Sequence, residues 1–434
     1  MSEVAAVRLW GRTIGAVSMG ARDRAAAFQY DNEFVGSGIE LSPLVMPLAR
    51  RVYTFPQLAG ATFHGLPGLL ADSLPDRFGN ALIDAWLAAD GRARDSFTAL
   101  ERLCYTGSRG MGALEFQPTL GPETKSSVRV HVDQLVDLAT RVLRERNTLS
   151  VSFSGEADAQ ALRHILAVGT SAGGARAKAV IAWNPTNNEV RCGQVPATDE
   201  FEYWLLKFDG VTGNRDKELA DPLGYGAIEF AYAKMATDAG ITMSACRLFE
   251  EHGRRHFMTR RFDRLASGGK LHMQSLAALA HFDFNMAGAY SYEQALLLMR
   301  RLDLPMSSIE QQFRRMAFNV IARNQDDHVK NIAFLMDRSG RWSLSPAFDV
   351  TWAFNPEGSG TSSHQMTING QRDDVTLHDL EECARTASMK RGRAKSIVAE
   401  VCAAVSRWPD YADNASVPAA WRDRVEASLR TTAF

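Results

Sequence analysis

The sequence NQDDHVKN (324–331), followed by SPAFDV (345–350), carries the most information about the fold and chemistry of this chain. Transfer of a phosphoryl group needs a carboxylate that accepts the proton of the nucleophile, and oxygen ligands that hold Mg²⁺ on the phosphates. Protein kinases place this base and an asparagine ligand at the spacing of Asp326 and Asn331, with a second carboxylate ligand further along the chain. Order and spacing therefore predict a phosphoryl-transfer site with Asp326 as base and with Asn331 and Asp349 as metal ligands.

A loop of small residues and a strand lysine precede this region in the order that a kinase uses. The segment GTSAGGARAK (169–178) allows backbone N–H groups to approach phosphates. It lacks the GK[ST] ending of a P-loop and the usual kinase GxGxxG, so taken alone it is better explained as a hairpin turn. Lys207 stands in the apolar strand YWLLKF, where an ammonium needs an anion. Glu229 on the next predicted helix is the expected partner, and the alternative is that both side chains face solvent.

The order of the predicted elements indicates an α+β fold. We expect a two-lobed, protein-kinase-like architecture with a small N-terminal sheet-plus-helices subdomain (1–120) and a polar linker at 121–127. A kinase N-lobe-like region with the phosphate-binding loop follows (128–265), and then a mostly helical C-terminal lobe with the catalytic loop (266–434).

The predicted elements follow from periodicity and from Gly and Pro punctuation. The predicted strands are VRLWG, RTIGAVSMG, AAFQYD, the alternating AKAVIAW, FEYWLLKFDG, RHFMTRRFDR and a hairpin that turns at Ser339-Gly340. The predicted helices are two segments broken at Pro75, SFTALERLCYTG ending at Gly107, VRVHVDQLVDLATRVLRER, 227–240, MQSLAALAHF, YEQALLLMRRL and a helical tail.

Composition excludes several classes of protein. The formal net charge is −1, from 49 basic and 50 acidic residues, so binding to nucleic acid or anionic membrane would need a local patch. The five cysteines are scattered and never spaced as CxxC, which argues against a disulfide framework or a zinc site. The N-terminus does not read as a signal peptide and no segment is long enough to span a membrane. We expect a cytoplasmic protein with no membrane partner.

With these motifs in place, the chain resembles the HipA family of serine/threonine protein kinases, the toxins of type II toxin–antitoxin loci. The resemblance extends over nearly the whole chain, including LPGLLADSLPDRFG and GSRGMGALEFQP near the N-terminus, MTRRFDR (258–264) at the adenine-binding hinge and SPAFDV at the metal site. It implies ATP and Mg²⁺ as cofactors. The residues that it implies are Ser171, Ala172, Gly173, Gly174, Lys178, Lys207, Glu229, Arg260, Phe262 and Asp263 for ATP (Arg260 and Phe262 through backbone groups, Asp263 near the ribose), Asp326 and His328 in the catalytic loop, and Asn331 and Asp349 for the metal.

The resemblance also implies regulation and partners. In the family a loop serine is autophosphorylated, which switches the enzyme off, and Ser171 is the aligned residue. Known members modify translation components, often aminoacyl-tRNA synthetases, and bind a helix-turn-helix antitoxin and through it operator DNA. The basic run MKRGRAK (389–395) falls where the family places DNA-facing residues, although a solvated helix start explains it at least as well. Its basic residues are Lys390, Arg391, Arg393 and Lys395.

The chain departs from the family pattern at three places. Arg260 replaces a hinge glutamate, Arg176-Ala177 replaces Gln-Glu in the loop, and the catalytic loop reads Asp326-Asp327-His328 in place of Asp-Gly-His. The last change leaves two candidates for the base, and the spacing to Asn331 favours Asp326.

Two other functions remain open from the sequence. A small-molecule phosphotransferase of the aminoglycoside-kinase kind shares the Asp-x4-Asn spacing and the later aspartate, but its design does not include the N-terminal subdomain. A non-catalytic DNA-bound co-repressor or pseudokinase scaffold is disfavoured by the intact Lys207, Asp326, Asn331 and Asp349.

Overall fold

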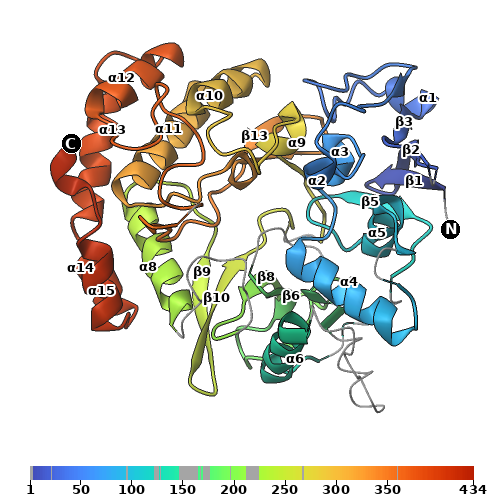
Figure 1. The fold of residues 1–434 in the computed structure, drawn as a ribbon, viewed down its shortest axis with the longest axis horizontal. Helices are drawn as coiled ribbons and strands as arrows, with labels where there is room; N and C mark the ends of the chain where they lie inside the picture. Colours follow the sequence, from blue (N-terminus) through green and yellow to red (C-terminus); the bar gives the residue numbers. More distant parts are fainter. Residues whose placement is uncertain are drawn as a thin grey trace.

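Three antiparallel sheets and the surrounding helices make up the part of the chain that the computed structural model describes (Figure 1). Within it, every helix is too short or too polar to cross a membrane. The described residues are 3–20, 22–93, 96–121, 127, 129–145, 165–166, 168–169, 176–195, 197–211, 224–265, 268–358 and 360–434.

The first sheet is built from the N-terminal segments predicted as strands and has the order β4-β3-β2-β1-β5. In β1, the alternating residues Ala5, Val7 and Leu9 are buried, as expected for a strand with one face on a core. The predicted helix stop at Gly107 is confirmed, since α5 ends there at a positive φ of 56°. The elements are β1 (Val4–Leu9), β2 (Arg12–Ser18), β3 (Ala27–Tyr30), α1 (Asn32–Val35), β4 (Val52–Tyr53), α2 (Gly60–Phe63), α3 (Gly68–Ala71), α4 (Arg77–Ala89), α5 (Ala99–Thr106) and β5 (Leu114–Gln117).

The second sheet has the order β7-β6-β8-β10-β9 and carries the strand lysine at its centre. All six residues of β6 are buried, so the expected alternation of buried and exposed positions is absent there. The reason is that α4 and α6 pack on the same apolar cluster as this strand, while β7 and β8 flank it. The elements are α6 (Val132–Glu145), β6 (Lys178–Trp183), β7 (Val190–Cys192), β8 (Glu202–Lys207), α8 (Tyr225–Asp238), β9 (Cys246–Glu251) and β10 (Arg254–Arg260).

The C-terminal third is mostly helical, as predicted, and contains a small sheet with the order β11-β12-β13. The predicted hairpin is confirmed as β12 and β13. The prediction of one helix over MQSLAALAHF is wrong at its start, because residues 272–275 pair with β12 and only then does α9 begin. The elements are β11 (His272–Ser275), α9 (Leu276–Ala280), α10 (Tyr292–Arg301), α11 (Met306–Ile321), η2 (Val329–Asn331), β12 (Ala333–Met336), β13 (Trp342–Leu344), α12 (Leu377–Thr386), α13 (Arg393–Val405), α14 (Trp408–Asn414), α15 (Ala419–Glu426) and η3 (Thr431–Ala433).

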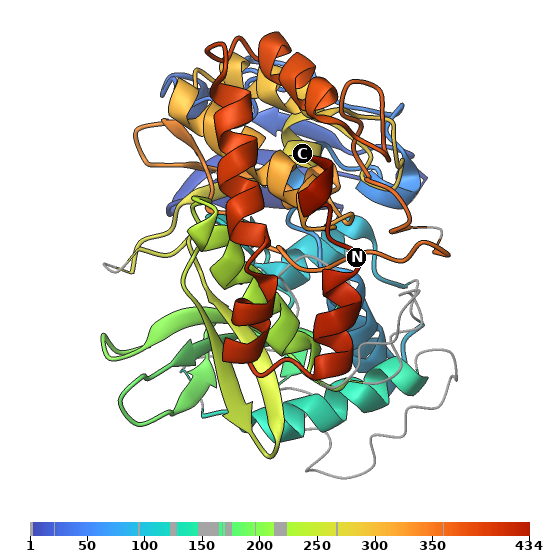
Figure 2. The same ribbon diagram turned by 90° about the vertical axis from the view of Figure 1, so that its left-hand side faces the viewer.

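Two buried apolar clusters divide the described residues differently from the predicted domain boundaries. One cluster joins the N-terminal sheet to the C-terminal helices. The other joins α4, which belongs to the N-terminal 120 residues, to α6 and the second sheet. Figure 2 shows the second sheet with α6 in the lower half of the molecule and the orange helices α10 to α12 in the upper half, while the red helices α14 and α15 lie in the lower half near α8. The first 120 residues thus contribute to both cores, and α4 packs with β6 and α6 in the second.

Candidate functional site

The loop predicted to be catalytic follows α11 and ends in the short helix η2. The side chain of Asp326 is 51% exposed, and Nε2 of His328 lies 3.8 Å from its Oδ1. The side-chain amide of Asn331 donates a hydrogen bond of 2.8 Å to the backbone oxygen of Asp326. Because the amide nitrogen is engaged in this way, the amide oxygen of Asn331 is the atom that can serve as a metal ligand.

The second aspartate of the loop, Asp327, has a structural position. Its carboxylate is buried and accepts hydrogen bonds from the hydroxyl of Tyr292 (2.8 Å), from Nδ1 of His364 (2.8 Å) and from the backbone N–H of Gln365 (2.7 Å). Burial raises the pKa of Asp327, but His364 and the hydrogen bonds outweigh it and hold the pKa below its usual value. The exposed Asp326 is therefore the aspartate of the two that can meet a substrate.

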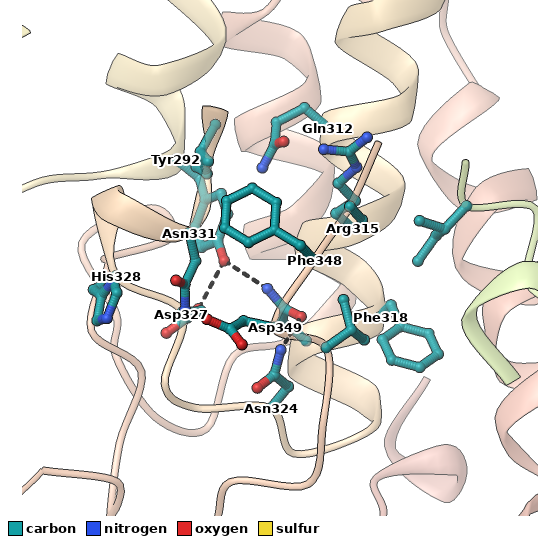
Figure 3. Close-up of a pocket in the computed structure, with 15 residues that line it drawn as sticks. Tyr292, Gln312, Arg315, Phe318, Asn324, Asp327, His328, Asn331, Phe348 and Asp349 are labelled. Carbon is teal, nitrogen blue, oxygen red and sulfur yellow. Dashed lines mark hydrogen bonds between the residues drawn. The ribbon is translucent and has the colours of Figure 1, made fainter. Parts of the chain in front are cut away.

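A pocket lies between this loop and the segment after β13 (Figure 3). Asn331 and Asp349, the two predicted metal ligands, both line it, and so does His328. Asp349 has a positive φ of 53°, a conformation that aspartate tolerates better than most residues. Figure 3 shows Gln312 and Arg315 of α11 on the same pocket. The structure thus brings together the pair that the sequence separates by a hairpin.

Lys207 at the end of β8 connects this pocket to the second sheet. Its ammonium forms ion pairs with the carboxylates of Glu229 on α8 and of Asp349, although the side chain is almost fully buried. Burial lowers the pKa of Lys207, but Asp349 and Glu229 more than compensate and raise it above its usual value. Glu229 also accepts a hydrogen bond of 3.2 Å from Arg176. The predicted lysine–glutamate pair is therefore present, and the alternative that both side chains face solvent is wrong.

Lys178, at the start of β6, lies beside Lys207 because the two lysines are paired across the strands β6 and β8. Its side chain is 2% exposed, and its Nζ lies 3.4 Å from Oδ2 of Asp76. Burial lowers the pKa of Lys178, and its neighbour Lys207 lowers it further, whereas Asp76 and Asp349 raise it. Asp76 is a site residue that the sequence did not indicate, since an aspartate before a helix is read locally as a cap.

Arg260 differs from its expected role at the adenine-binding hinge. Both backbone groups of Arg260 are engaged, since its N–H donates to Ala245 (2.8 Å) and its carbonyl accepts from the Ser244 hydroxyl (2.6 Å). The ring of Phe262 lies 5.8 Å from that of Phe348, beside Asp349. Phe262 thus packs against the residue that precedes the candidate metal ligand Asp349.

Asp263 does not fit the expected ribose contact. Its side chain has no exposed surface, and its carboxylate is bound by Arg261 (2.7 and 2.9 Å), by Arg264 (2.7 Å) and by the backbone N–H of Gly112 (2.6 Å). Burial raises the pKa of Asp263, but the two arginines outweigh it and hold the pKa far below its usual value. The buried carboxylate holds the hinge on the N-terminal segment through Gly112 and is not exposed to a ligand.

The remaining predicted residues divide into two groups. Ser171, Ala172, Gly173 and Gly174 lie outside the described residues. In the basic run, Lys390, Arg391 and Lys395 are exposed. Arg393 instead pairs with Glu310 (2.8 Å) and Glu400 (3.3 Å), so its charge is largely neutralised within the chain.

Two family matches cover most of the chain. Residues 5–117 match the HipA N-terminal domain, and residues 170–408 match the HipA-like C-terminal domain. The second match alone spans more than half of the 434 residues. The chain therefore belongs to the HipA family of toxins.

Solved structures agree with this assignment at the level of fold. HipA of Shewanella oneidensis MR-1, solved as a complex with HipB and its operator DNA, is similar with a TM-score of 0.68 and 17% identity, covering 98% of this chain and 96% of that one. The proinflammatory kinase CtkA of Helicobacter pylori has a TM-score of 0.34 and 10% identity over 59% of this chain and 92% of its own, which is too low to carry an argument. A comparison with curated proteins gave no match.

Proposed function

We propose that this protein is a serine/threonine protein kinase that transfers the γ-phosphoryl group of ATP, with Mg²⁺, to a hydroxyl of a protein substrate. The observation that carries the proposal is the position of Lys207, whose ammonium is shared by Glu229 on α8 and by Asp349 on the pocket. A kinase needs this lysine–glutamate pair and a metal-binding aspartate in one place. Membership of the HipA family supports the same activity.

The residues present fit a magnesium site. Mg²⁺ prefers one or two protein oxygen ligands together with phosphates and waters, and the carboxylate of Asp349 and the amide oxygen of Asn331 would supply them. Bound there, the ion would neutralise charge on the transferred phosphoryl group. Lys207 would hold the nucleotide phosphates, and Glu229 would fix the direction of its side chain.

Asp326 would accept the proton of the substrate hydroxyl. Its exposure leaves the carboxylate accessible to a protein substrate, and the hydrogen bond from Asn331 to its backbone fixes the loop that carries it. His328 lies within 3.8 Å of the same carboxylate and would orient it. Asp327 would keep the loop in this conformation through its buried hydrogen bonds.

The family suggests the substrate and the partners. We infer that the substrate is a component of translation, such as an aminoacyl-tRNA synthetase, in the cytoplasm, and that Ser171 is autophosphorylated. A helix-turn-helix antitoxin and operator DNA are proposed partners, supported by the Shewanella HipA that was solved with HipB and its operator DNA. Of the basic run, the exposed Lys390, Arg391 and Lys395 are the residues that could meet DNA.

One experiment tests the activity. Purified protein is incubated with labelled Mg-ATP and a cell lysate, and phosphosites are mapped on the protein itself and on the lysate proteins. Asp326→Asn should abolish transfer while the melting temperature stays unchanged, because the side chain is half exposed. Asp90→Asn, at an exposed position after α4, is the matched control. Equal incorporation by wild type and Asp326→Asn contradicts the proposal, and transfer to aminoglycosides alone would assign a small-molecule phosphotransferase instead.

A further inference from the structure

The side chain of Asp76 has two separate contacts at the start of α4. One carboxylate oxygen, Oδ1, accepts a hydrogen bond of 2.6 Å from the backbone N–H of Gly79 and so caps the helix. The other, Oδ2, lies 3.4 Å from Nζ of Lys178. Among the described residues, Oδ2 has no hydrogen-bond donor, and its contact is the ion pair with this lysine. Capping therefore uses one half of the carboxylate and leaves the other half directed at Lys178.

The neighbourhood of Lys178 makes this contact necessary. Lys178 and Lys207 are directly opposite one another on paired antiparallel strands, so their side chains leave the same face of the sheet. Both side chains are buried, with exposed fractions of 2% and 7%. Two buried like charges repel each other, so each of them needs a nearby anion to offset this repulsion.

The carboxylates in direct contact with the two lysines differ. Lys207 is paired with Glu229 and Asp349, which belong to α8 and to the pocket. Lys178 is paired with Asp76, which belongs to the N-terminal 120 residues. The N-terminal region thus supplies the anion for the second lysine, and the packing of α4 against α6 and β6 holds that anion in place.

From this geometry we propose that Asp76 is a positioning residue of the nucleotide site, which holds the side chain of Lys178 beside Lys207 so that both lysines meet the phosphates of ATP. The inference rests on the proposed function, because it needs ATP to bind at Lys207. It adds that the N-terminal region is part of the kinase site, and that displacement of α4 would weaken nucleotide binding without any change in the catalytic loop.

Asp76→Asn is the variant that isolates the ion pair. Asparagine caps a helix about as well as aspartate, so the hydrogen bond to Gly79 is retained and only the charge facing Lys178 is lost. We expect the dissociation constant for Mg-ADP, measured by calorimetric titration, to rise about tenfold or more. The KM for ATP should rise in parallel, with a smaller change in kcat, because Asp76 does not touch the reacting atoms. Asp31→Asn, which caps α1 and faces no lysine in the described structure, is the matched control and should bind as wild type does.

A double-mutant cycle separates this role from a general loss of structure. In a Lys178→Met background, Asp76→Asn should cause no further loss of Mg-ADP affinity, since the group that Asp76 positions is gone. If Asp76→Asn alone does not fold, the comparison of Lys178→Met with the double variant still decides the matter. Wild-type affinity in Asp76→Asn, or an equal loss in both backgrounds, overturns the inference and leaves the proposed kinase intact. Failure of the wild-type protein to bind Mg-ADP or Mg-ATP overturns both.

Discussion

Nδ1 of His364 lies 2.8 Å from a carboxylate oxygen of Asp327, and both side chains are 1% exposed. The two residues are 37 positions apart, one in the catalytic loop and one in the segment beyond Asp349. The adjacent backbone N–H of Gln365 donates to the other oxygen of the same carboxylate. One buried carboxylate therefore ties together the two segments that carry the candidate base and the candidate metal ligand.

Substitution of Asp327 should lower stability and activity together. Asp327→Ala removes the partner of His364, Tyr292 and the Gln365 N–H, and loss of one member of a buried pair costs about 3 kcal/mol or more in the free energy of unfolding. Urea denaturation measures this change. Asp326→Ala is the control, since its exposed side chain should cost less than about 0.5 kcal/mol. Equal stability of the two variants would show that the buried network does not support the loop.

Removal of the Asp263 carboxylate should loosen the hinge from the N-terminal segment. Asp263→Asn leaves Arg261 and Arg264 without a buried counter-charge, so we expect a loss of about 3 kcal/mol in the free energy of unfolding. Limited proteolysis should then cut near Gly112, whose N–H donates to the same carboxylate. Asp283→Asn, at a partly buried carboxylate outside the hinge, is the comparison. If Asp263→Asn binds nucleotide more weakly but is as stable as the wild type, Asp263 contacts the ribose, contrary to what its burial indicates.

The metal requirement should depend on Asp349. Asp349→Asn keeps the shape of the side chain and removes its charge, so the Mg²⁺ concentration for half-maximal phosphate transfer should rise roughly tenfold or more. The activity of the variant at saturating Mg²⁺ separates weaker metal binding from loss of the lysine contact. Asp337→Asn, in the β12–β13 turn, leaves the pocket untouched and is the control. An unchanged Mg²⁺ dependence would place the metal elsewhere.

Stability should fall as the pH is lowered from 7 to 5. Burial lowers the pKa of His256 and of His281 to about 4, and that of His272 to about 3. The unfolded chain therefore takes up protons below about pH 6.5 that the folded chain does not, which favours unfolding by roughly 1–2 kcal/mol for each histidine at pH 5.

The buried carboxylates do not contribute to the change in stability between pH 7 and pH 5. Asp263 and Asp327 have lowered pKa values in the fold, so their contribution is present above the unfolded value of about 3.9 and is lost only below it. Urea denaturation at pH 7 and pH 5 measures the histidine effect, and His272→Gln should flatten the profile. Equal unfolding free energies at the two pH values would contradict the prediction.

Local sequence was sufficient for several of the elements and for the Lys207–Glu229 pair. The apolar alternation of β1, the stop of α5 at Gly107 and the β12–β13 hairpin follow from short-range patterns and are present in the structure. The pairing of Lys207 with Glu229 was predicted because a lysine in an apolar strand requires a nearby anion. The strand β11 was missed, since a short apolar segment reads as helix until its pairing partner is known.

Tertiary structure decided which charged groups meet. From the sequence, Asp76 had no predicted role, Asp263 was assigned to the ribose through the family resemblance, and Asp327 was the second candidate for the base. In the structure they contact Lys178, the N–H of Gly112 and His364, respectively. These partners lie between 37 and 151 positions away in the sequence. Burial excludes water from these carboxylates, so each must find its counter-charge or donor within the protein, and only the packed chain determines which group that is.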